Sequence, residues 1–385
     1  MLPRDHLHFD ACRICNLLNF SHEMYETMTF DEKSAEFLEN LLITPSPAGF
    51  EKAGQQVWVD HLRPLADHVE TDAYGSAAAH IEVNPDAVTV MLESHCDEIG
   101  MIIQFIDESG FIYINKVGGS DPSIASARKV FIHSRDGIVS GVIGHTAIHL
   151  QDKDQNKSPK WSDLFIDIGA SSREEALGMI QVGDPVTLAE QFEFLSDDII
   201  TGRALDNRIG GIVLARVIEK LQHRRSDLKV NVIALNAVQE EIGGYGARMM
   251  TYRYEPDVAL VTDVTHATDS PGINHKQHGL VKLGSGPVIN HGGANHTKVM
   301  SCIEKTAMQM GIDFQREASG SRTGTDTDSI FYQKKGVPSG LVSLPLRYMH
   351  TPVEMISIND VIQLSDLLAE TVMNMDTRQN FSVFD

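Results

Sequence analysis

The chain has 385 residues and a formal net charge of −21 at pH 7, from 53 acidic and 32 basic side chains. This length exceeds what one ordinary hydrophobic core holds, so we expect two or three domains. The 42% hydrophobic and 22% charged shares are those of a soluble globular protein. The negative charge disfavours nucleic acid and anionic membrane surfaces as partners, because both repel it.

The N-terminal residues 1–30 show no firm periodicity and are interpreted as an extension. Cys12 and Cys15 form a lone C-x-x-C there, without the second ligand pair that a structural zinc site needs, so we expect free thiols. Acids and histidines interrupt this segment, unlike a secretory signal, and no apolar run in the chain reaches membrane-spanning length. The sequence therefore predicts a cytoplasmic protein.

Ordered structure is expected to begin at Asp31, a candidate N-cap for a helix over 32–42. A second amphipathic helix is predicted over 50–62. The apolar run 87–92 is typical of a buried strand, and it leads directly to His95.

In the middle of the chain, the sequence pattern changes to one of short strands joined by turns. Two hairpins are predicted over 101–114 and 130–143, the second around a tight turn. One short helix is expected after Ser172, which could form a capping box with Glu175. Residues 102–199 are therefore interpreted as a small β-barrel or sandwich domain of their own.

The remainder alternates helices with strands: helix 208–223, strands 229–235 and 258–262, helix 297–310, strand 340–344 and helix 360–373, the last capped by Asn359 or Asp360. Such alternation predicts an α/β fold, with a mostly parallel sheet covered by helices on both faces. Residues 31–101 and 200–376 would then form one α/β domain that the β domain interrupts. Residues 377–385 are left as a C-terminal tail.

Acids and histidines stand at predicted strand ends or in the loops beyond them, where open α/β sheets place their sites. They are His95 with Asp97, Asp206, Glu240 with Glu241, Asp263, and His350. Singly, each is more often a solvated histidine, a helix cap or a charged strand exit. Together at one sheet edge, the carboxylates would repel one another unless cations lay among them. Two metal ions sharing one bridging carboxylate would relieve this repulsion.

Two other chemistries fit the sequence less well. The acid and nucleophile of a glycosidase flank the scissile bond about 5–9.5 Å apart, whereas Glu240 and Glu241 are neighbours in the chain. No G-x-S-x-G motif is present, and Cys96 beside His95 is better interpreted as a packed thiol than as a nucleophile.

Five strings in this order, SHCDEIG, RALDNRIGG, VQEEIGGYGA, TDVTHATDSPG and LRYMHTPVE, resemble those of the cytosolic metallo-aminopeptidases that assemble as tetrahedral dodecamers. That group includes glutamyl aminopeptidases and relatives labelled endoglucanases. The similarity extends over residues 31–376, and the strings GGSDPSIASARKVFIH and GVIG within the β domain also resemble the family's pattern.

The resemblance implies a co-catalytic two-metal centre. Its expected ligands are His95 with Asp263 on one ion, Glu241 with His350 on the other, and Asp206 between them. The resemblance further implies Glu240 as the general base, Asp97 as the carboxylate that orients His95, and a cis peptide bond between Asp206 and Asn207. No ligand is expected from residues 103–198.

The activity that the resemblance implies is the removal of N-terminal residues from peptide substrates. Two divalent ions would be the cofactors, with Zn²⁺ first and Co²⁺ or Mn²⁺ also suited to nitrogen and oxygen ligands. The family's inserted domain mediates dimerisation, so we expect a homo-oligomer, either a dimer or a dodecamer. The same metal site could also serve a carboxypeptidase or an N-deacylase, or persist in an inactive metal-binding scaffold.

Overall fold

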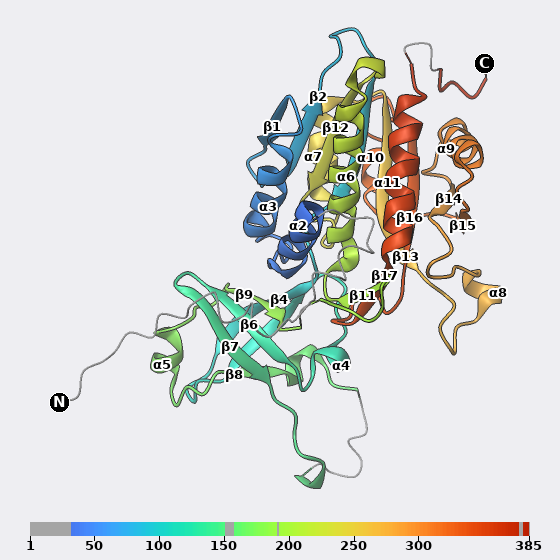
Figure 1. Cartoon of the computed structure of the whole chain (residues 1–385). Helices are drawn as coiled ribbons and strands as arrows, with labels where there is room; N and C mark the ends of the chain where they lie inside the picture. The colour runs from blue at the N-terminus through green and yellow to red at the C-terminus, as the bar shows by residue number, and fades with distance from the viewer. Residues whose placement is uncertain (1–31, 151–157, 191, 377–379, 385) are drawn as a thin grey trace.

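The computed structural model describes residues 32–150, 158–190, 192–376 and 380–384. The predicted extension, the cap at Asp31 and the pair Cys12 and Cys15 lie outside these residues. Figure 1 shows a layered α/β unit with a separate β unit beneath it in this view. Among the described helices, none combines the length and the apolar composition that crossing a membrane would require.

The α/β unit is built on one eight-stranded sheet. In spatial order its strands are β1 (His68–Thr71), β2 (Ala77–Ile81), β12 (Asn231–Ala237), β3 (Thr89–His95), β13 (Val258–His266), β16 (Ser339–Leu346), β14 (Val288–Gly292) and β15 (Gln315–Ser319). The four central strands, β12, β3, β13 and β16, run parallel to one another, and so do β14 and β15. Antiparallel pairing joins β1 to β2, β2 to β12 and β14 to β16. The prediction of a mostly parallel sheet is confirmed.

Helices cover both faces of this sheet. On one face lie α2 (Glu32–Ile43), α3 (Lys52–Leu62), α6 (Leu205–His223), α9 (Thr297–Met310) and α11 (Ile358–Met373), and on the other α7 (Tyr245–Tyr254) and α10 (Thr327–Ile330). Successive side chains of a strand point to opposite faces. In β3, accordingly, Val90 and Leu92 pack with α6 and α11, whereas Met91 packs with α7 and α10.

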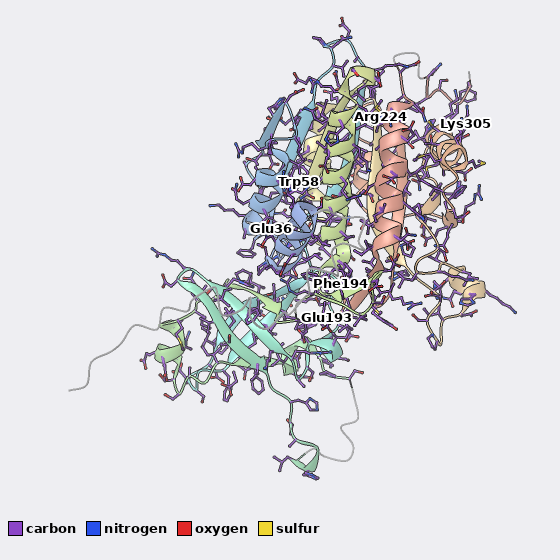
Figure 2. The ribbon with its side chains drawn as sticks, viewed as in Figure 1. Glu36, Trp58, Glu193, Phe194, Arg224 and Lys305 are labelled. Carbon is purple, nitrogen blue, oxygen red and sulfur yellow. The ribbon has the colours of Figure 1, made fainter. Side chains whose placement is uncertain are left out.

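The start of α6 lies very close to the sheet because the chain has glycines there. A Cβ on Gly210 would come within 2.8 Å of the Ser94 Cβ, so only glycine allows this approach. The next residue, Gly211, accepts a hydrogen bond of 3.0 Å from the indole of Trp58 on α3, and Figure 2 shows Trp58 in this layer. The string RIGG therefore brings Asp206, at the beginning of α6, against the end of β3.

The inserted unit is a closed six-stranded barrel. Its strands are β4 (Gly100–Ile106), β5 (Ile112–Val117), β6 (Lys129–Ser134), β7 (Gly137–Ile143), β8 (Phe165–Asp167) and β9 (Pro185–Leu188). Side chains such as Ile103, Val130 and Ile166 form its own core, separate from those of the α/β unit. The prediction of a small inserted β-barrel is confirmed.

The chain returns from the barrel through a small three-stranded sheet. Its strands are β10 (Glu193–Phe194), β11 (Ile199–Gly202) and β17 (Glu354–Ser357), with β11 between the other two. Because β17 immediately precedes α11, β10 and β11 belong with the α/β unit. Figure 2 places Glu193 and Phe194 beside this junction.

Two predicted helix caps differ in detail. The short α5 (Arg173–Leu177) does begin after Ser172, whose side chain accepts a hydrogen bond from the Glu175 amide. The Glu175 carboxylate binds Ser171 instead of the Ser172 amide, so the capping box is only half formed. For the last helix, Asn359 and Asp360 were the wrong choice of N-cap, since the cap is Ser357. The remaining short helices are α4 (Pro122–Ala125) and α8 (His275–His278).

Candidate metal centre

The predicted site residues come together at the carboxyl-terminal edge of the parallel strands. His95 ends β3, Asp263 lies near the end of β13, and Asp206 lies at the start of α6. Although His95 and Asp206 are separated in sequence by the whole barrel, the His95 Nε2 lies 3.3 Å from the Asp206 Oδ1 and 3.6 Å from the Asp263 Oδ1. These three buried residues form the sheet group.

A second group lies on loops around the other oxygen of Asp206. The His350 Nε2 is 3.2 Å from the Asp206 Oδ2 and 3.5 Å from the Glu241 Oε1. Glu241 follows β12 and His350 follows β16, and both are only partly buried. Asp206, Glu241 and His350 form the loop group. Asp206 therefore belongs to both groups, as a bridging ligand must.

The geometry of both groups fits a divalent ion. Within each group, one candidate donor atom from every residue lies within 4.8 Å of the others. Two nitrogen or oxygen ligands about 2.1 Å from a tetrahedral ion lie roughly 3.4 Å from each other, close to the separations between the histidines and their carboxylates. The residues that the sequence proposes as ligands thus provide two adjacent N/O donor sets.

The remaining ring nitrogens of both histidines have hydrogen-bond partners. The His95 Nδ1 lies 3.2 Å from the Asp97 carbonyl oxygen and 3.4 Å from its Oδ1. The His350 Nδ1 lies 3.2 Å from the carbonyl oxygen of Gly119, in the barrel. Since these oxygens only accept, each Nδ1 carries a proton, which leaves each Nε2 as the ring nitrogen that can bind a metal ion once its own proton is lost.

Asp97 also organises the loop that carries the two adjacent glutamates. Its carboxylate accepts hydrogen bonds from the backbone amides of Glu240, at 3.0 Å, and Glu241, at 3.1 Å. Asp97 is fully buried, so it has no freedom to leave these contacts. The Glu240 Oε2 lies 3.9 Å from the His95 Nε2, farther than either carboxylate of the sheet group. Glu240 is thus beside the donor atoms rather than among them.

Sequence reasoning missed Glu354, which joins the two groups through the backbone. One oxygen of this buried carboxylate accepts a hydrogen bond from the Asp206 amide at 3.1 Å, and the other accepts from the His350 amide at 2.8 Å. Burial raises the pKa of Glu354 well above its usual range. Glu354 is the last residue of the string LRYMHTPVE, which contains His350, and this was the feature of the sequence that could have indicated it. Its role could not be predicted, because it acts on backbone groups rather than as a ligand.

The pKa values show that the carboxylates need positive charge among them. Burial acts to lower the pKa of His350, but hydrogen bonds with Asp206 and Glu241 raise it to about 11. Burial likewise opposes protonation of His95, yet Asp206 and Asp263 raise its pKa well above the usual range. Burial raises the pKa of Glu241, with Asp206 adding repulsion. Protonated histidines or bound cations can supply the required charge.

The peptide bond between Asp206 and Asn207 is cis, as expected. The Asn207 side chain holds this turn against its surroundings: its Nδ2 donates to the Thr262 carbonyl at 3.0 Å, and its Oδ1 accepts from the Gly210 amide at 3.0 Å. Both contacts are made by the residue that immediately follows Asp206.

The barrel touches the loop group without providing a donor side chain in any of the described residues. Of the three candidates that would have contradicted this, His149 belongs to no donor group, and Asp152 and Asp154 lie outside the described residues. A Cβ on Gly119 would lie 2.7 Å from the His350 Nδ1, and one on Gly118 would lie 3.2 Å from the Glu241 Oε2. Glycine at both positions is what lets the barrel approach the site.

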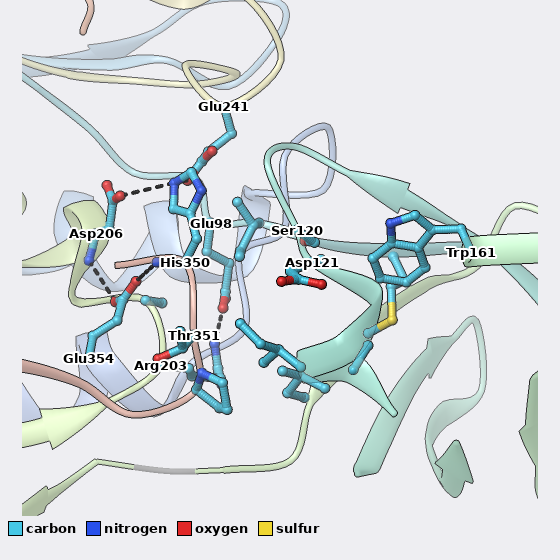
Figure 3. A pocket seen from close by; sticks show the side chains of 18 residues that line it. Glu98, Ser120, Asp121, Trp161, Arg203, Asp206, Glu241, His350, Thr351 and Glu354 are labelled. Carbon is cyan, nitrogen blue, oxygen red and sulfur yellow. Dashed lines mark hydrogen bonds and ion pairs between the residues drawn. The ribbon is translucent and has the colours of Figure 1, made fainter. Parts of the chain in front are cut away.

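A pocket lies where the two units meet. Figure 3 shows Asp206, Glu241 and His350 on one side of it and Ser120, Asp121 and Trp161 of the barrel on the other. On the α/β side, Glu98 pairs with Arg203. The donor groups are therefore reached from a space that both units line.

Two other groups, one with a thiol and one with possible metal ligands, are poorly suited to a reactive or metal-binding role. Cys96 is buried, and burial raises the pKa of its thiol well above the usual range, which agrees with a packed thiol rather than a nucleophile. A further donor group, His68, Glu70 and His80, lies on β1 and β2. Glu70 already accepts hydrogen bonds from Arg253, at 2.7 Å, and Tyr254. The Arg253 charge disfavours a cation there.

Comparison with known proteins agrees with this geometry. The chain is 32% identical over 348 residues to the lysyl aminopeptidase of Pyrococcus furiosus, covering 89% of this chain and 98% of that protein. Its structure is similar to that of the TET aminopeptidase from the marine sediment archaeon Thaumarchaeota archaeon SCGC AB-539-E09, with a TM-score of 0.86, 30% identity, and coverage of 90% and 97%.

A second solved structure is that of the Pyrococcus horikoshii TET1 peptidase, which "can assemble into a tetrahedron or a large octahedral shell". The TM-score is 0.80 and the identity 29%, with 89% of this chain and 100% of that chain covered. The family model of the M42 glutamyl aminopeptidases matches residues 75–367, more than half of the chain. This match includes the barrel and all seven predicted site residues. The chain therefore belongs to the M42 family of glutamyl aminopeptidases.

Proposed function

We propose that this chain is an aminopeptidase whose reaction depends on two divalent metal ions, with zinc as the first candidate. The observation that carries this proposal is the sharing of Asp206 between two donor groups, one oxygen facing each histidine. His95 and Asp263 would hold one ion, and Glu241 and His350 the other. Imidazole and carboxylate donors suit Zn²⁺, Co²⁺ and Mn²⁺. When bound, such a pair of ions lowers the pKa of a water and polarises the scissile carbonyl.

Glu240 is assigned the proton transfers. Burial raises the pKa of its carboxyl group, with the neighbouring carboxylates of Asp326 and Asp263 adding to the shift. A carboxylate with a raised pKa can take a proton from the attacking water and then donate it to the departing amine. Its position beside the donor atoms, held through the backbone by Asp97, supports this role.

The substrate is proposed to be a peptide with a free N-terminus. A free α-amine is attracted by the carboxylates around the donor groups, whereas a blocked one offers no charge. A carboxypeptidase would instead need cationic groups for the substrate's C-terminal carboxylate. Among the described residues that line the pockets around the donor groups, Arg203 is the one arginine or lysine, and it is already paired with Glu98. The lining thus favours the aminopeptidase over this alternative.

We also propose that the chain forms a homo-oligomer and acts in the cytoplasm. The assembly of the P. horikoshii TET1 peptidase supports oligomerisation. The predicted barrel domain, residues 102–199, is the candidate dimerisation surface. Analytical ultracentrifugation is expected to show a dimer or a dodecamer, and a monomer at micromolar concentration would contradict this part of the proposal.

The function is tested on full-length protein whose metal content has been measured. We expect hydrolysis of tripeptides with free N-termini, loss of that activity with a chelator, and its return with zinc, cobalt or manganese. Peptides with acetylated N-termini are expected to remain intact. Cleavage from the C-terminus, or removal of the acetyl group, would favour the carboxypeptidase or N-deacylase. Binding of metal without hydrolysis of any peptide would favour an inactive scaffold.

A further inference from the structure

A cavity opens beside the donor groups on the side of β13, β14 and β15. Beyond the donors themselves, polar residues such as Thr265, Asn290 and Thr323 make up much of its lining. Glu317 adds a carboxylate, and none of the described residues that line the cavity is lysine or arginine. An apolar substrate side chain that entered this cavity would gain little from such a lining, whereas a polar or cationic one would find hydrogen-bond partners there.

Glu317 is held in place but keeps hydrogen-bonding capacity. The Thr265 hydroxyl donates to its Oε2 at 2.7 Å, and among the described residues this is the one hydrogen bond that the Glu317 side chain makes. Thr265 is itself buried on β13. The second oxygen of Glu317 is therefore available to a ligand in the cavity.

Nearby cations do not neutralise Glu317, because they are paired elsewhere. Arg316 directly precedes Glu317 on β15, so the two side chains point to opposite faces of the sheet. The Arg316 Nε donates to Glu304 on α9 at 2.9 Å. Arg322, in the following loop, lies 3.8 Å from an oxygen of Asp328. Bound divalent ions would offset the charges of the donor carboxylates, so Glu317 would remain as an uncompensated negative charge in the occupied site.

The distance from the donor groups to Glu317 matches a long side chain. Asp263 and Thr265 are two residues apart on β13 and face the same side, which separates them by about 7 Å. A lysine side chain, built from bonds of about 1.5 Å, extends roughly 6 Å from its Cα. A substrate whose α-amine and scissile carbonyl lie at the donor groups could therefore bring its terminal ammonium to the Glu317 carboxylate.

We propose that Glu317 selects peptides with a cationic N-terminal side chain, lysine or arginine. This inference rests on the proposed aminopeptidase function and assigns its substrate class. A lysine ammonium or an arginine guanidinium would form a charge-assisted hydrogen bond with the free oxygen of Glu317. An N-terminal glutamate would meet the same carboxylate with a like charge, and so would be rejected.

The test compares lysyl, norleucyl and glutamyl p-nitroanilides on metal-loaded full-length protein. Norleucine has the lysine chain without its ammonium, so the lysyl to norleucyl ratio of kcat/KM isolates the charge. We expect the wild type to prefer lysine, and Glu317→Gln to lower that ratio roughly 10- to 100-fold, as the loss of a hydrogen bond to a charged group does. Glu317→Lys is expected to shift the preference toward glutamate. Asp313→Asn, which removes an equal charge from the exposed segment before β15 and leaves Arg316 paired with Glu304, is the matched control and should leave the ratio unchanged.

Binding provides a second readout that does not need turnover. Calorimetry with the amino acids L-lysine and L-norleucine should show tighter binding of lysine to the wild type and no such difference in Glu317→Gln. A wild type that prefers norleucyl or glutamyl substrates, or a ratio that Glu317→Gln leaves unchanged, would overturn the inference while leaving the aminopeptidase intact. If no anilide is hydrolysed, the proposed function fails, and the calorimetry still decides whether Glu317 recognises a cationic side chain.

Discussion

The two donor groups that share Asp206 are built in different ways. The sheet group places His95 and Asp263 within strands, and the His95 side chain is only 2% exposed. The loop group places His350 on a residue with a φ of 60°, and its side chain is 32% exposed. Non-glycine residues rarely adopt such a conformation without support from their surroundings. The sheet ladder orders one group, whereas Glu354 and the barrel order the other.

This difference implies that the donor positions of the loop group can change more easily than those of the sheet group. Its donors depend on contacts that come from outside the α/β sheet, above all from Gly119 in the barrel. Any change in how the barrel sits against the α/β unit would reach the His350 ring first. The sheet group has no such contact with the barrel among the described residues. Variants that affect one group and spare the other can therefore test the comparison.

The largest expected effect concerns the two adjacent glutamates, which the comparison places in different roles. Glu240→Gln should keep both metal ions and lower kcat by roughly 10²–10⁴, the usual contribution of proton transfer. Glu241→Gln should lose metal from the loop group as well as activity. Metal content by mass spectrometry, measured beside kcat for both variants, decides the assignment. Metal loss in Glu240→Gln, with an active and fully loaded Glu241→Gln, would reverse it.

A methyl group added at the barrel should weaken the loop group alone. In Gly119→Ala the new Cβ would lie 2.7 Å from the His350 Nδ1 and would displace the ring. We expect metal affinity in the loop group to fall by up to about 100-fold, within the range for changes to the partners of ligating histidines. Gly144→Ala is the control, because its nearest contact would be 3.8 Å from Phe165. Equal losses from both donor groups, measured by titration with zinc, would argue against the comparison.

A smaller effect is expected from Glu354→Gln. The amide retains one acceptor oxygen but places an N–H₂ group against a backbone N–H, so it cannot hold both Asp206 and His350. Metal affinity should fall about 10-fold. Asp360→Asn is matched to it, since the buried Asp360 carboxylate also accepts from two backbone amides, those of Gly284 and Gly286, at 2.8 Å each. That control should lower thermal stability without changing zinc affinity, and a loss of zinc affinity in both would show a general effect on folding.

The smallest expected effect is a dependence of metal affinity on pH. Because the carboxylates raise the pKa of His350 to about 11, this imidazole is protonated at neutral pH until a cation displaces the proton. Metal binding should therefore release protons, and affinity should rise with pH by about tenfold per unit for each proton released. Calorimetry in buffers of different ionisation enthalpy between pH 6 and pH 8 measures the number released. An affinity that is independent of pH would contradict the account of the loop group.

Much of the fold could be predicted because its apolar periodicity is strong. Helix α9 spans the predicted residues 297–310, and the central strands β3, β12, β13 and β16 are all apolar runs. Four strands of the sheet were missed, namely β1, β2, β14 and β15, and β2 and β15 show the physical reason. The strand β2 is AAAHI, with little intrinsic strand preference, and β15 is the polar edge strand QREAS. Both are formed by pairing with neighbours that the local sequence does not reveal.

The same distinction applies to the site. The side chains proposed as ligands could be picked out because acids and histidines at strand ends are chemically conspicuous. Glu354 and Gly119 could not, since one acts through backbone amides and the other through its carbonyl and its missing side chain. The boundaries of the inserted domain were also beyond the sequence pattern. The barrel strands run from Gly100 to Leu188. The strands β10 and β11 follow them in sequence, but they form a sheet with β17 and so do not belong to the barrel.

The central claim is that two ions share Asp206, and anomalous diffraction tests it most directly. Data collected on either side of the zinc absorption edge, from zinc-loaded crystals of the full chain, should show two anomalous peaks. One should lie among His95, Asp206 and Asp263, and the other among Asp206, Glu241 and His350, with full occupancy more easily lost from the second. A single peak, or two peaks without a common contact to Asp206, would contradict the account.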